Sequence, residues 1–391
     1  MLQKLFRPML LIVVLTLFAA MAVACAPAAP AAPAAPAEGA TAPAEEAAPA
    51  AEGEGLVGIV LPTRDEPRWL QDQARFEELL GSAGVPVQIL FSQGDSAVER
   101  SNVESLITQG AQVIILTPHD GAAAAAAAGV ARDAGAKVIS YDRLILDTDA
   151  VDYYVTFDSV AVGEAQAQYL ADRAEGEGTP LYLYAGAATD NNAFLFFEGA
   201  WNVLQPLIAD GTFVIKNSSE AVALQDKAEL TRDEMAAIIG QVTTNWDFNT
   251  AKNLAEANLT ATAAEDKGDV FILAPNDGTA RSIADAFAAD AEVTSYVITG
   301  QDAEVASVQY IIDGKQSMTV LKDTRTLAAD AITAATTFLA GGTPEQTTTY
   351  NNGAMDVPAK PSEVVTVDQD NVQEAIVESG YWPAEEFTGL E

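Results

Sequence analysis

The residues of this chain that could do chemistry follow its short, hydrophobic, strand-like segments. At these ends the apolar run gives way to a polar turn, and the turns contain Arg68-Trp69, His119-Asp120, Asp142-Arg143, Asp190-Asn191-Asn192, Asn276-Asp277, Gln301-Asp302 and Lys322. In open α/β sheets, ligands bind outside the carboxyl ends of the strands. Seven polar ends therefore predict one site that is assembled from many loops.

The residue types in these turns suit a small ligand that is rich in hydroxyl groups. Asp and Asn offer pairs of oxygen acceptors, or an acceptor and donors, to adjacent hydroxyls. Arg and Lys donate charge-assisted bonds, and a buried group left unpaired by the wrong ligand costs about 1–3 kcal/mol. Trp69 and Trp246 are candidates to stack on the C–H face of a pyranose. Each assignment has an alternative: Trp69 could be a core residue, Asp302 could cap a helix, and Asp142-Arg143 could be a structural ion pair.

Motifs for catalysis, for nucleotides and for metals are missing from the sequence. It has neither a Walker A loop nor Gly-x-Gly-x-x-Gly after a strand. The single histidine, His119, cannot build a His-rich metal site, and it lacks a serine elbow or a partner cysteine. Carboxylate pairs for glycoside hydrolysis could be chosen freely among 56 Asp and Glu residues, so no pair is informative. We therefore expect a binding protein without enzymatic activity, cofactor or metal.

The first 24 residues indicate an export signal. A basic start is followed by an apolar segment, Met9–Ala20, that is too short to span a bilayer well. Cys25, the only cysteine, follows small residues in a pattern that resembles a bacterial lipobox, although Ala22 stands where Leu is usual. The resemblance implies cleavage before Cys25 and a lipid on its thiol. The alternative is an ordinary secreted protein with an incidental cysteine.

Composition separates a tether from the folded part of the chain. Residues 25–55 are almost entirely Ala, Pro, Glu and Gly, which cannot bury apolar surface and are typical of a linker. The rest is too long for one compact core and natural for two lobes. Lys plus Arg number 20 against 56 Asp plus Glu, a net charge of −36. This balance argues against nucleic acid and against docking on anionic lipid by charge.

Beyond the tether, β-branched segments alternate with amphipathic helical stretches. Strands are expected at 56–61, 87–91, 113–117, 137–141, 180–185, 212–216, 270–274, 296–299 and 317–321. Helices are expected at 68–83, 97–109, 121–134, 160–174, 192–207, 231–242, 249–259, 279–289, 303–313 and 327–340. Repeated strand–helix–strand units predict parallel sheets with helices on both faces. The units after Gln301 would fit if the chain returned to the first lobe there.

An ordered set of short motifs carries a family resemblance. It comprises Arg68-Trp69, Ser140-Tyr141-Asp142-Arg143, Tyr154-Val155-Thr156-Phe157-Asp158, Asp190-Asn191-Asn192-Ala193, Asn276-Asp277, Gly300-Gln301-Asp302-Ala303, Met318-Thr319-Val320-x-Lys322 and Asn351-Asn352-Gly353. In this order the motifs resemble the periplasmic xylose-binding and multiple-sugar-binding proteins of ABC importers. The resemblance implies a type I periplasmic-binding-protein fold, α/β, in which two Rossmann-like lobes with parallel sheets are joined by three hinge crossovers.

The resemblance also implies lobe boundaries and ligand roles. We expect crossovers near Asp158, Gln301 and Tyr350, with residues 55–158 and 302–345 in the N-terminal lobe and 159–301 and 346–391 in the C-terminal lobe. Ligand contacts are implied for Arg68, Asp142, Arg143, Asp190, Asn192, Asn276, Asp302 and Lys322, with Trp246 as the stacking platform.

Three departures from the xylose-specific pattern bear on the identity of the sugar. Pro62-Thr63 replaces Asp-Asp, which favours the multiple-sugar branch, and His119-Asp120 replaces Tyr-Asn. Residues 217–244 form a longer segment than in the xylose protein, which bears on the role of Trp246.

The expected function is capture of a monosaccharide, such as xylose, glucose or a similar aldopyranose, and its delivery to an ABC permease. The protein would be a monomer outside the cytoplasm, anchored to the membrane by lipid on Cys25. One alternative is a sugar or signal receptor for a chemoreceptor or sensor kinase, and another is a surface glycosidase.

Overall fold

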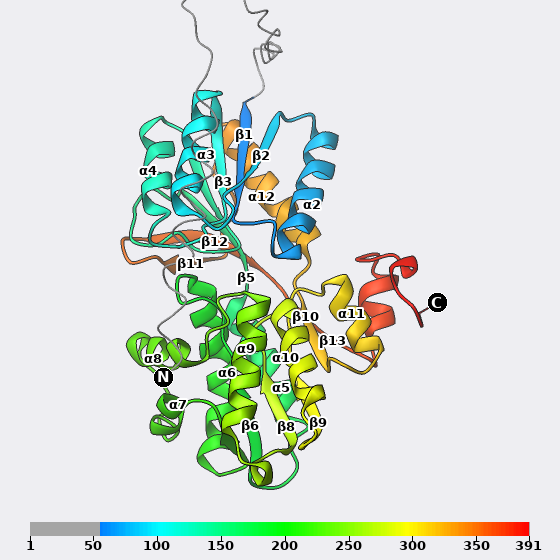
Figure 1. Cartoon of the computed structure of the whole chain (residues 1–391). Coiled ribbons are helices and arrows are strands. Elements are labelled where there is room, and N and C mark those ends of the chain that lie inside the picture. The colour runs from blue at the N-terminus through cyan, green and yellow to red at the C-terminus, as the bar shows by residue number, and fades with distance from the viewer. Residues whose placement is uncertain (1–54, 391) are drawn as a thin grey trace, which may run out of the picture. The chain divides into compact units, whose positions relative to one another are not determined.

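The computed structural model describes residues 55–390, which form two α/β lobes (Figure 1). The expected signal peptide, Cys25 and nearly all of the tether lie outside the described residues. The first lobe contains a seven-stranded sheet with the order β11-β12-β5-β4-β3-β1-β2. Its strands are β1 (Leu56–Leu61), β2 (Val87–Phe91), β3 (Ala111–Leu116), β4 (Lys137–Tyr141), β5 (Tyr153–Phe157), β11 (Thr348–Asn351) and β12 (Asp356–Ser362). All neighbouring pairs are parallel except β11 and β12.

The second lobe contains a four-stranded parallel sheet with the order β7-β6-β8-β9. Its strands are β6 (Thr179–Leu183), β7 (Phe213–Ile215), β8 (Gly268–Leu273) and β9 (Val293–Ile298). Two further strands, β10 (Met318–Leu321) and β13 (Val365–Asp368), form a separate antiparallel pair. This pair lies beside the end of β9, where Val320 forms a β-bridge with Gln301.

Helices cover both faces of each sheet, as the alternating sequence pattern predicts. The helices of the first lobe are α2 (Pro67–Ala83), α3 (Ser96–Thr108), α4 (Ala125–Asp133) and α12 (Thr324–Leu339). Those of the second lobe are α5 (Ser159–Ala171), α6 (Asn191–Ala209), α7 (Ser219–Ala223), α8 (Arg232–Val242), α9 (Phe248–Ala261), α10 (Asp277–Ala289) and α11 (Val305–Ile312). None of the helices described between residues 55 and 390 combines the length and the apolar character needed to cross a bilayer.

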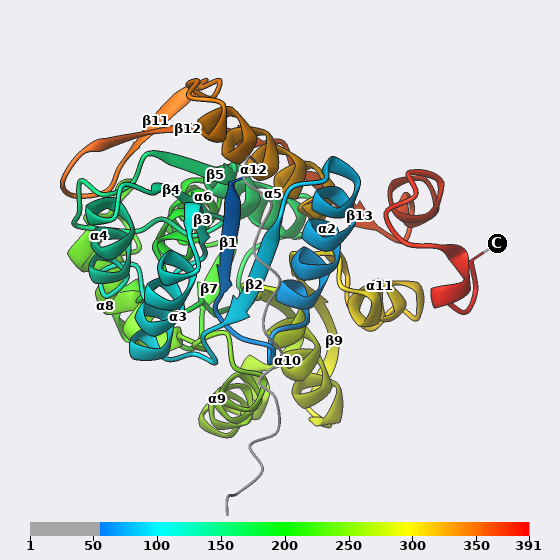
Figure 2. The same cartoon turned by 90° about the horizontal axis from the view of Figure 1, so that it is seen from above.

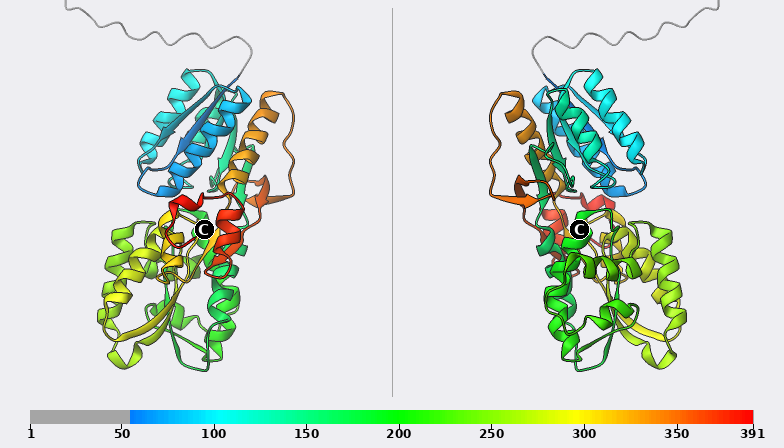
Figure 3. Two further views of the ribbon diagram at one scale, coloured as in Figure 1. Left: turned by 90° about the vertical axis from the view of Figure 1, so that its right-hand side faces the viewer. Right: turned by 90° about the vertical axis from the view of Figure 1, so that its left-hand side faces the viewer.

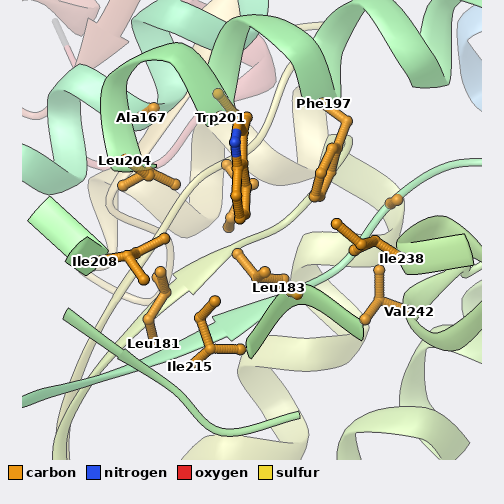
Figure 4. Close-up of a cluster of buried hydrophobic side chains, with 14 of the residues drawn as sticks. Ala167, Leu181, Leu183, Phe197, Trp201, Leu204, Ile208, Ile215, Ile238 and Val242 are labelled. Carbon is orange, nitrogen blue, oxygen red and sulfur yellow. The ribbon is translucent and has the colours of Figure 1, made fainter. Parts of the chain in front are cut away.

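The period-two alternation of strand side chains divides the core of the first lobe into two layers. Val57, Ile59 and Leu61 pack with residues of α2 and α12, whereas Val60 packs with residues of α3 and α4. Figure 2, seen from above, shows these helix pairs on opposite sides of β1 and β3. In the second lobe, Trp201 of α6 covers Leu181 and Leu183 of β6 within a buried cluster (Figure 4).

Two glycines let α5 and α6 approach each other closely. A Cβ on Gly163 would lie 1.9 Å from the carbonyl oxygen of Phe196, and a Cβ on Gly199 would lie 2.0 Å from that of Val160. Neither approach leaves room for a side chain. This contact fixes the first turns of α6 at the carboxyl end of the second sheet.

The connections between the lobes differ from the expected boundaries at two of three points. The chain passes into the second lobe at Asp158, between β5 and α5. It does not return near Gln301, because backbone hydrogen bonds such as Asp302 N to Val320 O (2.9 Å) hold residues 302–321 beside β9. The return lies at Lys322-Asp323, and α12 then packs against α2 and β3–β5.

The last crossover also lies later in the sequence than expected. Residues 346–362 belong to the first lobe and not, as the resemblance implies, to the C-terminal lobe, because β12 pairs in parallel with β5 and extends the first sheet. Pro358 and Pro361 lie inside β12, where proline removes a backbone donor and argues against a strand. The chain crosses back only between Ser362 and Val365.

Candidate ligand-binding site

A pocket with about 290 Å³ of empty space, part of it open to solvent, lies where polar turns of the two lobes meet. The cavity is lined by Glu66, Arg68, Trp69, Asp142, Arg143, Asp190, Asn192, Phe196, Trp246, Asn276, Gln301, Asp302 and Lys322. The structure therefore brings all ten sequence-predicted site residues together.

Strand ends and helix starts position these side chains. Asp142 and Arg143 follow β4, and Lys322 follows β10. Other lining residues sit where helices begin: Arg68 and Trp69 in the first turn of α2, Asp190 as the N-cap of α6 and Asn276 as the N-cap of α10. The alternative that Asp302 caps the following helix is wrong, because Glu304 precedes α11 at that position.

Arg68 is the centre of an ion network on the first-lobe side. Its Nε lies 2.6 Å from Asp72, its Nη2 lies 3.0 Å from Asp142, and its Nη1 lies 3.5 Å from Asp302 of the second lobe. Burial alone would lower the pKa of Arg68, but the carboxylates of Asp72, Asp142 and Asp302 outweigh it and hold the pKa well above its usual value. The guanidinium group thus stays charged, and its ion pairs with the three carboxylates fix its orientation.

Asp302 uses one carboxylate oxygen for protein contacts. Its Oδ1 forms an ion pair with Lys322 Nζ at 2.9 Å and accepts a long hydrogen bond from Arg68 Nη1 at 3.5 Å. Within residues 55–390, Oδ2 has no hydrogen-bond partner. One oxygen is therefore anchored, and the other can accept hydrogen bonds from a ligand.

A second ion cluster joins the lobes at Arg143. Its Nε lies 3.0 Å from Asp190 and its Nη2 lies 3.3 Å from Glu66. Burial raises the pKa of both carboxyls, and Arg143 opposes this rise only in part. Nearby, Asn192 Nδ2 donates to the backbone oxygen of Asp142 at 2.9 Å, a further contact between the lobes.

Asp142 behaves differently from these carboxyls. Burial would raise its pKa, but Lys322, Arg68 and Arg143 outweigh burial and hold the pKa below its ordinary value. The lining as a whole contains four carboxyl groups and three cationic groups. Such a balanced lining offers donors and acceptors in many directions and suits a neutral polar ligand better than a charged one.

Aromatic rings supply the apolar wall of the cavity. Trp246 and Phe196 meet edge to face, with ring centroids 6.4 Å apart and an interplanar angle of 79°. Trp246 lies against Gly186, where a Cβ would come within 2.0 Å of the indole. The guanidinium carbons of Arg143 and Arg68 lie 4.9 Å and 5.2 Å from the centroid of the Trp69 ring.

Some polar atoms of lining residues are buried without a hydrogen-bond partner in the described part of the chain, among them Trp246 Nε1 and Gln301 Oε1. Buried polar groups are otherwise almost always paired, so such atoms need an explanation.

The backbone is also unusual at the site. Asp142 (φ 60°), Trp246 (φ 60°), Asp302 (φ 102°) and Ala303 (φ 49°) adopt positive φ although none is glycine. Such conformations cost of order 1–3 kcal/mol each and are concentrated at ligand sites. Local strain therefore sets the direction of three predicted ligand side chains.

The lining includes three residues to which the sequence analysis assigned no ligand contact. Glu66 precedes α2, Gln301 stands within the Gly300-Gln301-Asp302 motif, and Phe196 lies one turn after Asn192. His119 stands apart from the lining; its backbone N–H donates to Glu99 at 2.8 Å. Within residues 55–390 no group of three His, Cys, Asp or Glu side chains could hold a metal ion.

Comparisons with known proteins agree with this fold and site. The model of a family described as a periplasmic binding protein domain matches residues 57–343. The multiple sugar-binding periplasmic receptor ChvE of Rhizobium radiobacter is 35% identical over 343 residues, which cover 85% of this chain and 92% of that protein. The D-xylose-binding periplasmic protein of Escherichia coli is 30% identical over 325 residues, which cover 83% of this chain and 90% of that protein.

A solved structure lies closer still. The carbohydrate transporter solute-binding protein of Chloroflexus aurantiacus, in complex with D-glucose, is 73% identical with a TM-score of 0.85, and the match covers 86% of this chain and 98% of that chain. The chain therefore belongs to the periplasmic binding protein family. The resemblance to the type I sugar-binding proteins of ABC importers is confirmed, and this is a family of solute-binding proteins without enzymatic activity.

Proposed function

We propose that this protein captures a single monosaccharide, an aldopyranose such as glucose or xylose, and delivers it to an ABC permease. The observation that carries the proposal is the convergence of ten predicted ligand side chains, from both lobes, around one cavity. Its carboxylates, guanidinium groups and amides match the paired donors and acceptors of adjacent sugar hydroxyls. The neighbouring Trp246 supplies an apolar face for the C–H side of the ring.

Glucose is the first candidate among these sugars. The Chloroflexus aurantiacus protein was solved with D-glucose, and a Clostridium phytofermentans protein that is 31% identical, with a TM-score of 0.76, holds β-D-glucose. The match covers 85% of this chain and 99% of the second protein. The Escherichia coli relative is named for D-xylose, so pentoses remain in the candidate set.

The proposed mechanism is closure of the two lobes around the sugar. Asp142 and Arg68 act from the first lobe, and Asn276 and Asp302 act from the second. A ligand that contacts both sides stabilises the closed arrangement by its differential affinity for it. A micromolar dissociation constant corresponds to about −8 kcal/mol, which several hydrogen bonds and one stacked ring can supply. The sugar is released unchanged.

The location that fits this role is the outer side of the cell membrane. The N-terminal sequence predicts removal of residues 1–24, lipid on Cys25 and a tether reaching to residue 55. The partner would be the permease, which recognises the closed form. The alternative, a receptor for signalling, keeps the same sugar site and differs only in the partner.

Isothermal titration calorimetry of the wild-type protein against pentoses and hexoses tests the proposal. We expect D-glucose or D-xylose to bind with a dissociation constant in the micromolar range or below. Glucuronate serves as a charged control that should bind much more weakly. A panel in which no neutral monosaccharide binds would refute sugar capture. Uptake of the labelled sugar, measured with and without the gene, separates import from signalling.

A further inference from the structure

The C-terminal segment runs between the two lobes. After β13 the chain forms a π-helical turn, Gln373–Glu378, that packs with Val308 and Leu321 of the second lobe. Residues Ser379–Trp382 then reach the first lobe. Figure 3 shows this C-terminal segment, in red, at the level where the lobes meet.

Three hydrogen bonds attach Ser379–Trp382 to the first lobe. Arg325 Nη1, in the first turn of α12, donates to Ser379 O at 3.0 Å. On α2, Arg75 Nη2 donates to Tyr381 O at 3.3 Å, and Gln71 Oε1 accepts from the Tyr381 hydroxyl at 3.3 Å. Tyr381 is 1% exposed, and its two hydrogen bonds to α2 are partly buried, whereas the Arg325–Ser379 bond lies at the surface.

A fourth hydrogen bond attaches the same segment to the second lobe, beside the binding cavity. Trp382 Nε1 donates to the carbonyl oxygen of Ala303 at 2.8 Å. Ala303 follows Asp302, and both residues have positive φ. Two more hydrogen bonds hold this strained pair. Asp302 N donates to Val320 O at 2.9 Å, and Ala303 N donates to Thr319 Oγ1 at 3.2 Å.

We infer that Trp382 is a positioning residue for the binding site and that Ser379–Trp382 clasps the two lobes in their closed arrangement. The inference rests on the proposed sugar capture. The indole N–H fixes the Ala303 carbonyl, which maintains the strained backbone that directs the Asp302 carboxylate toward Lys322 and the cavity. Because the same segment is bonded to α2 and α12, separation of the lobes must break its contacts with one lobe. The clasp therefore slows ligand release.

Ligand kinetics distinguish a clasp from a general structural role. Trp382→Phe removes the N–H and keeps a ring, and Gln71→Ala removes the partner of Tyr381 on α2. Stopped-flow fluorescence with D-glucose should show dissociation about two- to tenfold faster in each variant, the range for one hydrogen bond, with association nearly unchanged. Unchanged dissociation rates in both variants would overturn the inference.

Gln309→Ala provides the matched control. Gln309 pairs with the backbone of Thr388 and ties the C-terminal segment to α11 within the second lobe only. We expect its dissociation rate to equal that of the wild type. If Gln309→Ala accelerates release as much as Trp382→Phe, the effect is general loosening of the C-terminus and the clasp is refuted.

Hydrogen–deuterium exchange of the full, ligand-free chain tests the clasp without a sugar. Trp382→Phe should speed amide exchange at residues 379–382 and at Ala303, whereas Gln309→Ala should not affect Ala303. Exchange at Ala303 equal to wild type would overturn the positioning role. If the wild-type protein binds no sugar but this exchange pattern holds, the proposed function fails and the clasp between the lobes stands.

Discussion

Arg143 Nε of the first lobe lies 3.0 Å from Asp190 Oδ2 of the second, and the two side chains are only 6% and 2% exposed. Removing one partner from such a buried pair leaves an uncompensated charge, which typically costs about 3–5 kcal/mol. The pair joins the lobes directly, so its energy bears on their closure. In an open arrangement water would solvate both groups.

Arg143→Leu should therefore weaken D-glucose binding more than it weakens folding. We expect an affinity loss of at least ~100-fold, because the closed form would bury Asp190 and Glu66 without their cation. The free energy of unfolding should fall by less than about 1 kcal/mol. Calorimetry and urea denaturation measure the two effects. Arg100→Gln, at an exposed ion pair on α3, should affect neither. An equal loss of stability and binding would contradict the prediction.

Asp302→Ala should remove a ligand contact and leave Lys322 without its anion. The expected loss of affinity is ~2–4 kcal/mol, or roughly 30- to 1000-fold. The fold should survive, because this side chain lines the cavity rather than the apolar core. Titration calorimetry on the folded variant is the measurement, and Asp302→Asn separates charge from shape. Wild-type affinity in the alanine variant would remove Asp302 from the site.

Gly186→Ala should displace the Trp246 indole, since the added methyl would come within 2.0 Å of the ring. We expect at least tenfold weaker binding and a shift in tryptophan fluorescence. Gly129→Ala is the matched control, because a Cβ there meets nothing within 4 Å. In helix α4 that change should stabilise the protein by about 0.5–1 kcal/mol. Similar fluorescence in wild type and Gly186→Ala would show that the indole is placed elsewhere.

Glu99 predicts a pH dependence of stability. Burial raises its pKa from 4.5 to about 7, although the hydrogen bond from the His119 N–H acts in the opposite direction. A carboxyl with a raised pKa in the folded state contributes its stability below about pH 4.5 and loses it as the pH rises through about 7.

Glu99→Gln keeps the acceptor for His119 and removes this titration. Since each pKa unit is worth about 1.4 kcal/mol, the variant should gain about 3 kcal/mol relative to wild type between pH 4 and pH 8. Urea denaturation across this range is the measurement. Glu104→Gln, exposed on the same helix, controls for removal of a charge. A constant difference between Glu99→Gln and wild type would refute the assignment.

Cys25→Ser tests the lipid anchor that the N-terminal sequence predicts. Without a thiol to acylate, the protein should remain unprocessed or appear in the soluble fraction. Membrane fractionation with metabolic labelling by palmitate measures the change. A serine variant that is processed and partitions into the membrane like wild type would contradict lipidation.

The sequence predicted which residues line one pocket better than it predicted the lobe boundaries. Short polar motifs follow β4 in the first sheet and β9 in the second, and ligands bind outside the carboxyl ends of such strands, so each motif is recognisable from its local sequence. Neither Glu66 nor Phe196 belongs to such a motif, and their contact with the pocket depends on how the two lobes meet.

The lobe boundaries depend on pairing between distant segments. The strand pattern of Met318–Leu321 was visible, but its place beside β9 rests on one bridge, between Val320 and Gln301. Pro358 and Pro361 argue against a strand at β12, because proline is uncommon inside sheets. The residues of β11 are mostly exposed and show no alternation of apolar and polar side chains. The positions of the second and third crossovers therefore depend on tertiary contacts that the local sequence does not show.

The burial of the cavity charges has a consequence for the surroundings in which the protein works. Arg68, Asp302 and Lys322 are each at most 5% exposed. Dissolved ions screen exposed charges over about 8 Å at physiological ionic strength, but they act far less on groups sealed inside protein. Capture of a neutral ligand by such groups should change little with salinity. A protein of an extracytoplasmic family meets a medium whose salt content the cell does not control, and this site is insulated from it.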